Sequence, residues 1–177
     1  MRPCGILLLA VAALGAISAC TSPAPVEYRT DEGNDPPVDV PPGAVAIQWQ
    51  KIDQLTSPVS QIRERRRLVI GSTAEWAAFW VEFHGAIVPL PELPDVDFEA
   101  SVVIAATMGA KSTGGFAISI RDVFQEDGTV IPVIVETAPG PGCVTLQVVT
   151  APAAGAVVAR SAGPVRFIEE TRTTSCG

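Results

Sequence analysis

Short apolar runs, some continuous and some alternating with polar residues, recur through much of the chain beyond residue 100, as is typical of strands. The longer predicted strands cover residues 102–107, 116–123, 130–137, 144–150 and 165–169, and shorter ones cover 47–50 and 68–70. Phe116, Ile118 and Ile120 alternate with small or polar neighbours, as in a half-buried strand. Asp127-Gly128 is a two-residue turn signal, so the strands on either side of it should pair antiparallel.

One amphipathic helix is predicted ahead of the long strands. Ser72 and Glu75 form a capping box, and Gly85 provides a stop. Four aromatic residues lie between them at helical spacing: Trp76, Phe79, Trp80 and Phe83. This stripe either packs on a sheet or offers a binding face. The predicted fold class is therefore α+β, mainly β: an antiparallel sheet or open barrel with one packed amphipathic helix.

The first twenty residues follow a different pattern, that of an export signal. Arg2 precedes an apolar run over residues 6–17, which is too short to span a bilayer. Residues 17–20, Ile-Ser-Ala-Cys, form a lipobox, so we expect a signal peptide over residues 1–19 and acyl chains such as palmitate on Cys20. The alternative is an ordinary secretory signal that ends beside a cysteine. A lipidated Cys20 predicts a lipoprotein of the cell envelope, anchored on the extracytoplasmic side. Thr21 favours the outer membrane if the cell has two.

Residues 20–43 are rich in proline and acidic residues and poor in large apolar ones. Such a segment cannot bury a core and is expected to be a disordered tether, with a reach of roughly 60–70 Å when extended. One globular domain is predicted over residues 44–177. Residues 1–19 hold Arg2 and no acidic residue, so processing leaves 11 basic against 19 acidic residues, a net charge of −8. We therefore expect no nucleic-acid partner.

Two cysteines remain for pairing once Cys4 and Cys20 are set aside. In an oxidising compartment, Cys143 and Cys176 are expected to form a disulfide. The alternative is a reactive thiol, but neither cysteine has a basic residue or histidine beside it.

No set of catalytic residues is recognisable, so we expect neither enzymatic activity nor a cofactor or metal. The single histidine, His84, falls at the end of the predicted helix, and no nucleophile elbow or paired metal-ligand spacing occurs. The acid pairs Asp95/Asp97 and Glu169/Glu170 are not shown to face one substrate. Residues 108–116 fail the phosphate-loop pattern and are either a glycine turn or a partner-binding loop.

Four arginines lie close together just before the predicted strand at residues 68–70: Arg63, Arg65, Arg66 and Arg67. Such a run either forms a solvated face or docks an acidic partner or lipid headgroups.

An ordered set of motifs between Thr73 and Arg160 resembles the PrcB C-terminal domain family. The motifs are Trp76 and Trp80, Asp97-Phe98, Met108-Gly109 with Lys111, Thr113-Gly114-Gly115-Phe116, Glu136, Pro139-Gly140-Pro141-Gly142, Gln147 and Thr150-Ala151-Pro152. The resemblance implies a non-catalytic domain that binds or stabilises a protein partner, such as an exported protease complex.

The expected contact surface combines the two glycine-containing loops. Its residues are Lys111, Thr113, Gly114, Gly115, Phe116, Pro139, Gly140, Pro141 and Gly142. The alternative function is an envelope protease inhibitor or a small hydrolase, the latter to be tested at Asp97 and Glu136.

Overall fold

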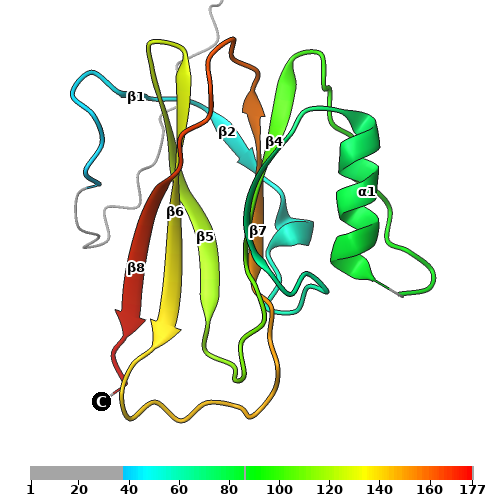
Figure 1. Cartoon of the computed structure of the whole chain (residues 1–177), viewed down its shortest axis with the longest axis vertical. Helices are drawn as coiled ribbons and strands as arrows, with labels where there is room; N and C mark the ends of the chain where they lie inside the picture. The colour runs from blue at the N-terminus through cyan, green and yellow to red at the C-terminus, as the bar shows by residue number, and fades with distance from the viewer. Residues whose placement is uncertain (1–37, 86, 177) are drawn as a thin grey trace, which may run out of the picture. The chain divides into compact units, whose positions relative to one another are not determined.

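Two four-stranded sheets lie face to face in the part of the chain that the structure describes (Figure 1). This computed structural model describes residues 38–85 and 87–176. The predicted signal peptide, Cys20 and the first part of the tether therefore lie outside the described residues.

Sheet A has the order β1-β5-β6-β8, and sheet B has the order β2-β7-β4-β3. The strands of sheet A are β1 (Val45–Ala46), β5 (Ala117–Glu126), β6 (Thr129–Pro139) and β8 (Ile168–Thr174). Those of sheet B are β2 (Trp49–Lys51), β7 (Ala153–Ala159), β4 (Ser101–Met108) and β3 (Arg65–Ile70). All pairs are antiparallel except β6 with β8. The predicted fold class is confirmed, with open sheets and not a closed barrel.

Strand β4 lies in the middle layer of three, between sheet A on one side and a helix on the other. Val102, Ile104 and Ala106 point between the two sheets, where they join a buried cluster with residues of β5, β6 and β7. Val103 and Ala105 point to the opposite face of sheet B, and both are fully buried there as well. Because both of its faces are covered, β4 is apolar along almost its whole length.

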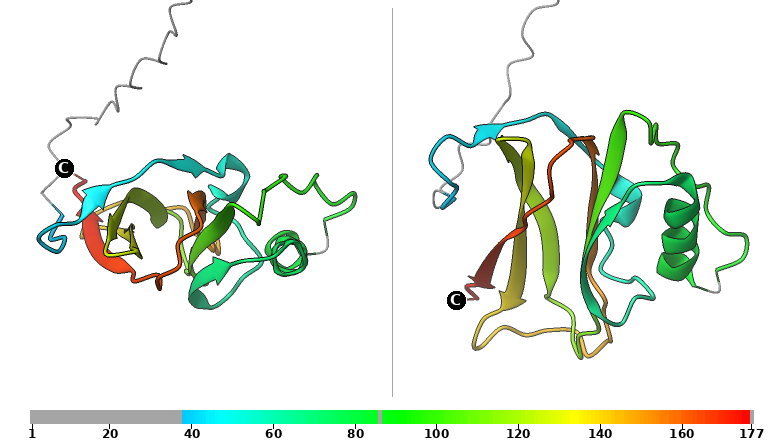
Figure 2. Two further views of the ribbon diagram at one scale, coloured as in Figure 1. Left: turned by 90° about the horizontal axis from the view of Figure 1, so that it is seen from above. Right: turned by 45° about the horizontal axis from the view of Figure 1, so that its top comes forward.

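The helix α1 (Thr73–His84) covers that second face of sheet B (Figures 1 and 2). Ser72 caps it by accepting the N–H of Glu75 (3.3 Å), and the Glu75 carboxylate accepts the N–H of Gly71 (2.9 Å). The four predicted aromatic residues are buried against the sheet, which shows that the stripe belongs to the core. Among the described residues, no helix has the length and apolar character needed to cross a membrane.

The hairpin at Asp127-Gly128 is confirmed, with φ of 46° and 79° at its two turn residues. The predicted strand over residues 144–150 is wrong. This segment is irregular, and only Thr150 forms a bridge, to Lys111. Its β-branched residues suit a strand, but strand propensity is realised only where a cross-strand surface is available. The last strand also begins later than predicted, at Ile168.

Candidate functional site at the loop end

Two loops meet at one end of the sandwich, which we call the loop end (Figure 1). The glycine loop, residues 109–116, joins β4 to β5, and the long loop, residues 140–152, joins β6 to β7. Lys111 and Thr150 exchange backbone hydrogen bonds of 2.7 and 3.0 Å, and Gly114 donates its N–H to Leu146 O at 2.9 Å. The Thr150 hydroxyl donates to Thr113 O at 2.9 Å. The structure therefore brings together the two segments that the sequence singled out.

Two of the predicted glycines are required by close approaches within the loop end. Gly115 has a φ of +86°, and a Cβ there would lie 3.2 Å from both Pro139 and Thr145. A Cβ on Gly140 would clash with the carbonyl oxygen of Thr174. Gly114 has more room, since a Cβ there would meet Leu146 only at ordinary contact distances of 3.6–3.8 Å. Gly115 and Gly140 thus have a structural role, whatever the surface around them binds.

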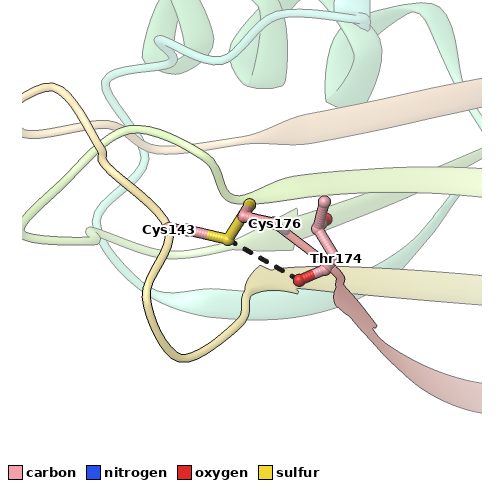
Figure 3. Close-up of a disulfide and its surroundings, with 3 residues drawn as sticks. All are labelled: Cys143, Thr174 and Cys176. Carbon is pink, nitrogen blue, oxygen red and sulfur yellow. Dashed lines mark hydrogen bonds between the residues drawn. A yellow bond between two sulfur atoms is a disulfide. The ribbon is translucent and has the colours of Figure 1, made fainter.

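The predicted disulfide is confirmed and fixes the long loop near its start (Figure 3). Cys143 and Cys176 have Sγ atoms 1.96 Å apart and Cα atoms 5.1 Å apart. Cys143 Sγ also lies 3.7 Å from Thr174 O, the contact that is dashed in Figure 3. A disulfide sulfur carries no proton to donate, so this is a van der Waals contact. Gly140 adds a true hydrogen bond by donating its N–H to Thr174 O (3.1 Å).

Four aliphatic side chains project into solvent from the long loop, and together they form what we call the apolar loop surface. Val144 is 101% exposed, Leu146 77%, Val148 48% and Val149 52%. Single exposed aliphatic residues are common, but four within six residues on a fixed loop form a patch typical of interaction sites. Sequence reasoning assigned these residues to a strand and therefore missed the surface. The available signal was an aliphatic run bounded by Cys143 and Pro152, in which only Thr145 and Gln147 interrupt the four exposed aliphatic residues.

The other predicted contact residues border this surface. The Lys111 ammonium lies 5.5 Å from the centroid of the Phe116 ring, within the range of a cation–π interaction. Pro141 and Gly142 are exposed at the turn before Cys143, whereas Thr113 is half-buried under the long loop. Lys111 and Phe116 are therefore the predicted side chains that are best placed to extend the apolar loop surface.

Two arginines of the run, Arg65 and Arg67, have a structural explanation in contacts between the two sheets. Arg65 and Arg67 on β3 bind Glu136 on β6 and Glu169 on β8, forming what we call the arginine–glutamate cluster. The Arg65–Glu136 and Arg67–Glu169 distances are 2.8 and 2.7 Å. Burial alone would raise the pKa of Glu136, but hydrogen bonds from Arg67 and Arg65 outweigh it, so the pKa is lowered. Because β3 belongs to sheet B and β6 and β8 to sheet A, the cluster ties the two sheets together.

Of the acidic residues considered for catalysis, Glu136 and Glu169 are both bound by Arg65 and Arg67. Glu169 belongs to the cluster between the sheets, whereas its neighbour Glu170 faces the opposite way and pairs with Arg121 at 3.0 Å. Asp97 accepts the N–H of Glu99 at 2.9 Å within a turn. Glu169 and Glu170 therefore do not face one substrate position.

His84 ends α1 with its ring 4.4 Å from the ring centroid of Trp80 and 4.9 Å from that of Phe83. Burial lowers the pKa of His84, which favours the neutral imidazole. Residues 38–85 and 87–176 contain no group of three or more potential His, Cys, Asp or Glu ligands arranged to hold a metal ion.

These features define a class: a small β-sandwich domain with a helix on one outer face and a disulfide-fixed loop end. Residues 102–159, from β4 to β7, match the family model described as PrcB C-terminal, so this region is similar to the PrcB C-terminal domain family. The match confirms the family resemblance and includes the whole of the glycine loop and of the long loop. The tryptophans of α1 and the Asp97-Phe98 motif lie before the matched residues. Comparison with curated proteins and with solved structures gave no match.

Proposed function

We propose that this protein is a membrane-anchored lipoprotein whose PrcB-like domain binds and stabilises a protein partner, without catalysis of its own. An exported protease complex is the class of partner that the family resemblance suggests. The lipobox at Cys20 and the proline-rich tether support presentation of the domain away from the membrane surface.

The observation that carries the proposal is the apolar loop surface. Leu146 and Val149 are exposed by 77% and 52%, yet their loop is fixed by the Cys143–Cys176 disulfide and by backbone bonds to the glycine loop. A surface that is already ordered loses little conformational entropy on binding, and exposed aliphatic groups gain most from being covered. An ordered apolar patch is therefore well suited to contact another protein.

The test is affinity capture of the full lipidated chain from the gently solubilised envelope of the cell that produces it, with mass spectrometry of co-purifying proteins. Val149→Asp is the test variant, and Val81→Asp is a matched control because Val81 is 53% exposed on α1, away from the loop end. We expect an exported protein to co-purify with the wild type and the control and to be lost with Val149→Asp. Identical recovery with all three proteins would exclude the loop surface as the contact.

Membrane anchoring has its own test. Cys20→Ser should abolish incorporation of radiolabelled palmitate and move the protein from the membrane fraction to the soluble fraction. Unchanged labelling of that variant would exclude Cys20 as the lipid site.

A further inference from the structure

Strand β5 has an edge that is only partly covered. β1 pairs with Phe124 and Gln125 alone, and the chain leaves sheet A after Ile47 donates its N–H to Val123 O (3.0 Å). Along Ala117–Ile120, no described residue pairs with β5 on the side away from β6. An uncovered strand edge is a template on which another strand can form.

The register shows which backbone groups this edge offers. Val130 on β6 donates its N–H to Pro164 O on the β8 side (3.0 Å), so even-numbered residues of β6 turn their backbone groups toward β8. Ile118 and Ile120 pair with even-numbered residues of β6, and their own N–H and C=O groups therefore face away from β6. Val123 supports this assignment, because it also pairs with an even-numbered residue of β6 and its carbonyl faces away from β6, toward Ile47.

Two hollows open beside this edge, between the sheets. The larger, of about 160 Å³, is lined by Thr56, Ser57, Pro58, Phe116, Ala117, Ile118, Pro152 and Ala153. The smaller, of about 70 Å³, shares Thr56 and Ile118 with it and extends to Ile120. The larger is similar in size to an engineered apolar cavity of roughly 150 Å³ that binds benzene. One hollow could therefore accept a large apolar side chain and the other a small one.

The geometry of strand pairing connects the edge with the hollows. On an added strand, residues directly opposite Ile118 and Ile120 would point their side chains to the same side of the sheet as these isoleucines. That side is the space between the sheets, since both isoleucines belong to the buried cluster there. Residues two apart on the added strand would thus face the two hollows while the backbone completes the hydrogen bonds.

We propose that an extended segment of the partner protein, with apolar side chains at alternate positions, adds to sheet A along Ala117–Ile120. This inference rests on the proposed partner-binding function and names the form of the partner's contact. The groove is continuous with the loop end because Phe116, at the end of the glycine loop, lines the larger hollow.

Strand β1, which pairs with the other end of β5, does not extend along Ala117–Ile120. β1 runs antiparallel to β5 with Val45 opposite Gln125, so the residues just before Val45 continue away from Ala117. The residues after Ala46 cross to sheet B as β2. Addition by another chain is therefore the arrangement that completes the edge.

The test uses the full chain in detergent micelles and a random library of twelve-residue peptides displayed on phage. We expect selected peptides to share two apolar residues at positions i and i+2. Binding of the corresponding synthetic peptide should slow hydrogen exchange of the Ile118 and Ile120 amides. Thr56 is exposed and lines both hollows, so Thr56→Trp should weaken peptide binding at least tenfold, whereas Thr56→Ser should change it less than twofold.

Three results would overturn the inference: no peptide is selected, the bound peptide leaves exchange at Ile118 and Ile120 unchanged, or these amides become protected by self-association without any peptide. The hydrogen-exchange measurement uses the wild type and so does not depend on how the variants fold. Capture of a partner that is lost with Val149→Asp but unchanged with Thr56→Trp would retain the proposed function and exclude strand addition.

Discussion

Replacing Glu136 with glutamine is the sharpest test of how the two sheets are held together. The Glu136 side chain is 14% exposed and accepts hydrogen bonds from Arg65 and from Arg67, which is itself 11% exposed. Hydrogen bonds to charged groups contribute about 1.5–3 kcal/mol each. A glutamine amide keeps one acceptor oxygen, but its NH2 group is a donor that cannot bind the donor groups of a guanidinium. Arg67 retains Glu169, so we expect the free energy of unfolding to fall by about 2–3 kcal/mol.

Glu169→Gln provides the comparison, because Glu169 binds the same two arginines but is 36% exposed. Solvent can replace more of its interactions, so the expected loss is about 1 kcal/mol. The double variant Arg67→Met/Glu136→Leu should remain within about 1 kcal/mol of the wild type, since apolar residues can replace a buried ion pair. Urea unfolding followed by tryptophan fluorescence, with the disulfide intact, measures all three. A loss below about 0.5 kcal/mol for Glu136→Gln, or a larger loss for Glu169→Gln, would refute this reasoning.

The same residue predicts a dependence on pH. The pKa of Glu136 lies below its ordinary value of 4.5 in the folded protein, so at acid pH the unfolded chain binds this proton more readily. The stabilisation is therefore present above pH 4.5 and is lost as the pH falls through the folded pKa. Unfolding free energies measured between pH 6 and 3 should decline less steeply for Glu136→Gln than for the wild type. Equal slopes would show that Glu136 is not the titrating group.

Three further predictions concern the loop end and the helix. Reducing the Cys143–Cys176 disulfide, which spans a sequence separation of 33, should lower the free energy of unfolding by about 3–4 kcal/mol, measured in urea with and without reductant. Gly142→Ala, at φ +82° with no atom within 4 Å of the new Cβ, should cost about 1 kcal/mol. Gly109→Ala, at φ +71° with a backbone oxygen at 2.8 Å, should cost at least about 2 kcal/mol more; equal melting temperatures for the two variants would contradict this. Because burial lowers the pKa of His84 below 6.5, stability should fall as the pH drops below 6.5. In His84→Gln, the thermal unfolding midpoint should therefore depend less on pH between pH 7.5 and 5.5 than it does in the wild type.

Local chemistry made several elements of the fold predictable from the sequence. The Ser72–Glu75 capping box fixed the start of α1, and Asp127-Gly128 fixed the hairpin between β5 and β6. Each signal acts over a few residues, so it needs no knowledge of the rest of the chain. The pairing of β6 with β8 had no such signal, because it depends on a crossover between sheets.

The candidate site was predictable only in part, for the same physical reason. The glycines and the cysteine pair marked the two loops, since close backbone approaches and disulfides restrict residue type. The exposure of Val144 and Leu146 was not predictable, because the same aliphatic run is compatible with a buried strand and with an exposed loop. Nor could the open edge at Ile118 and Ile120 be found before the length of β1 was known.

The order of the strands along the chain has a consequence for how the domain folds. Trp49 on β2 pairs with Val158 on β7, Val45 on β1 pairs with Gln125 on β5, and Arg65 reaches Glu169 across 104 residues. Closing such distant contacts costs chain entropy before it yields any burial, so folding on the scale of milliseconds to seconds is expected. A nascent chain therefore has no sheet partner for β1 and β2 until its second half has been synthesised. Until then these two strands remain unpaired.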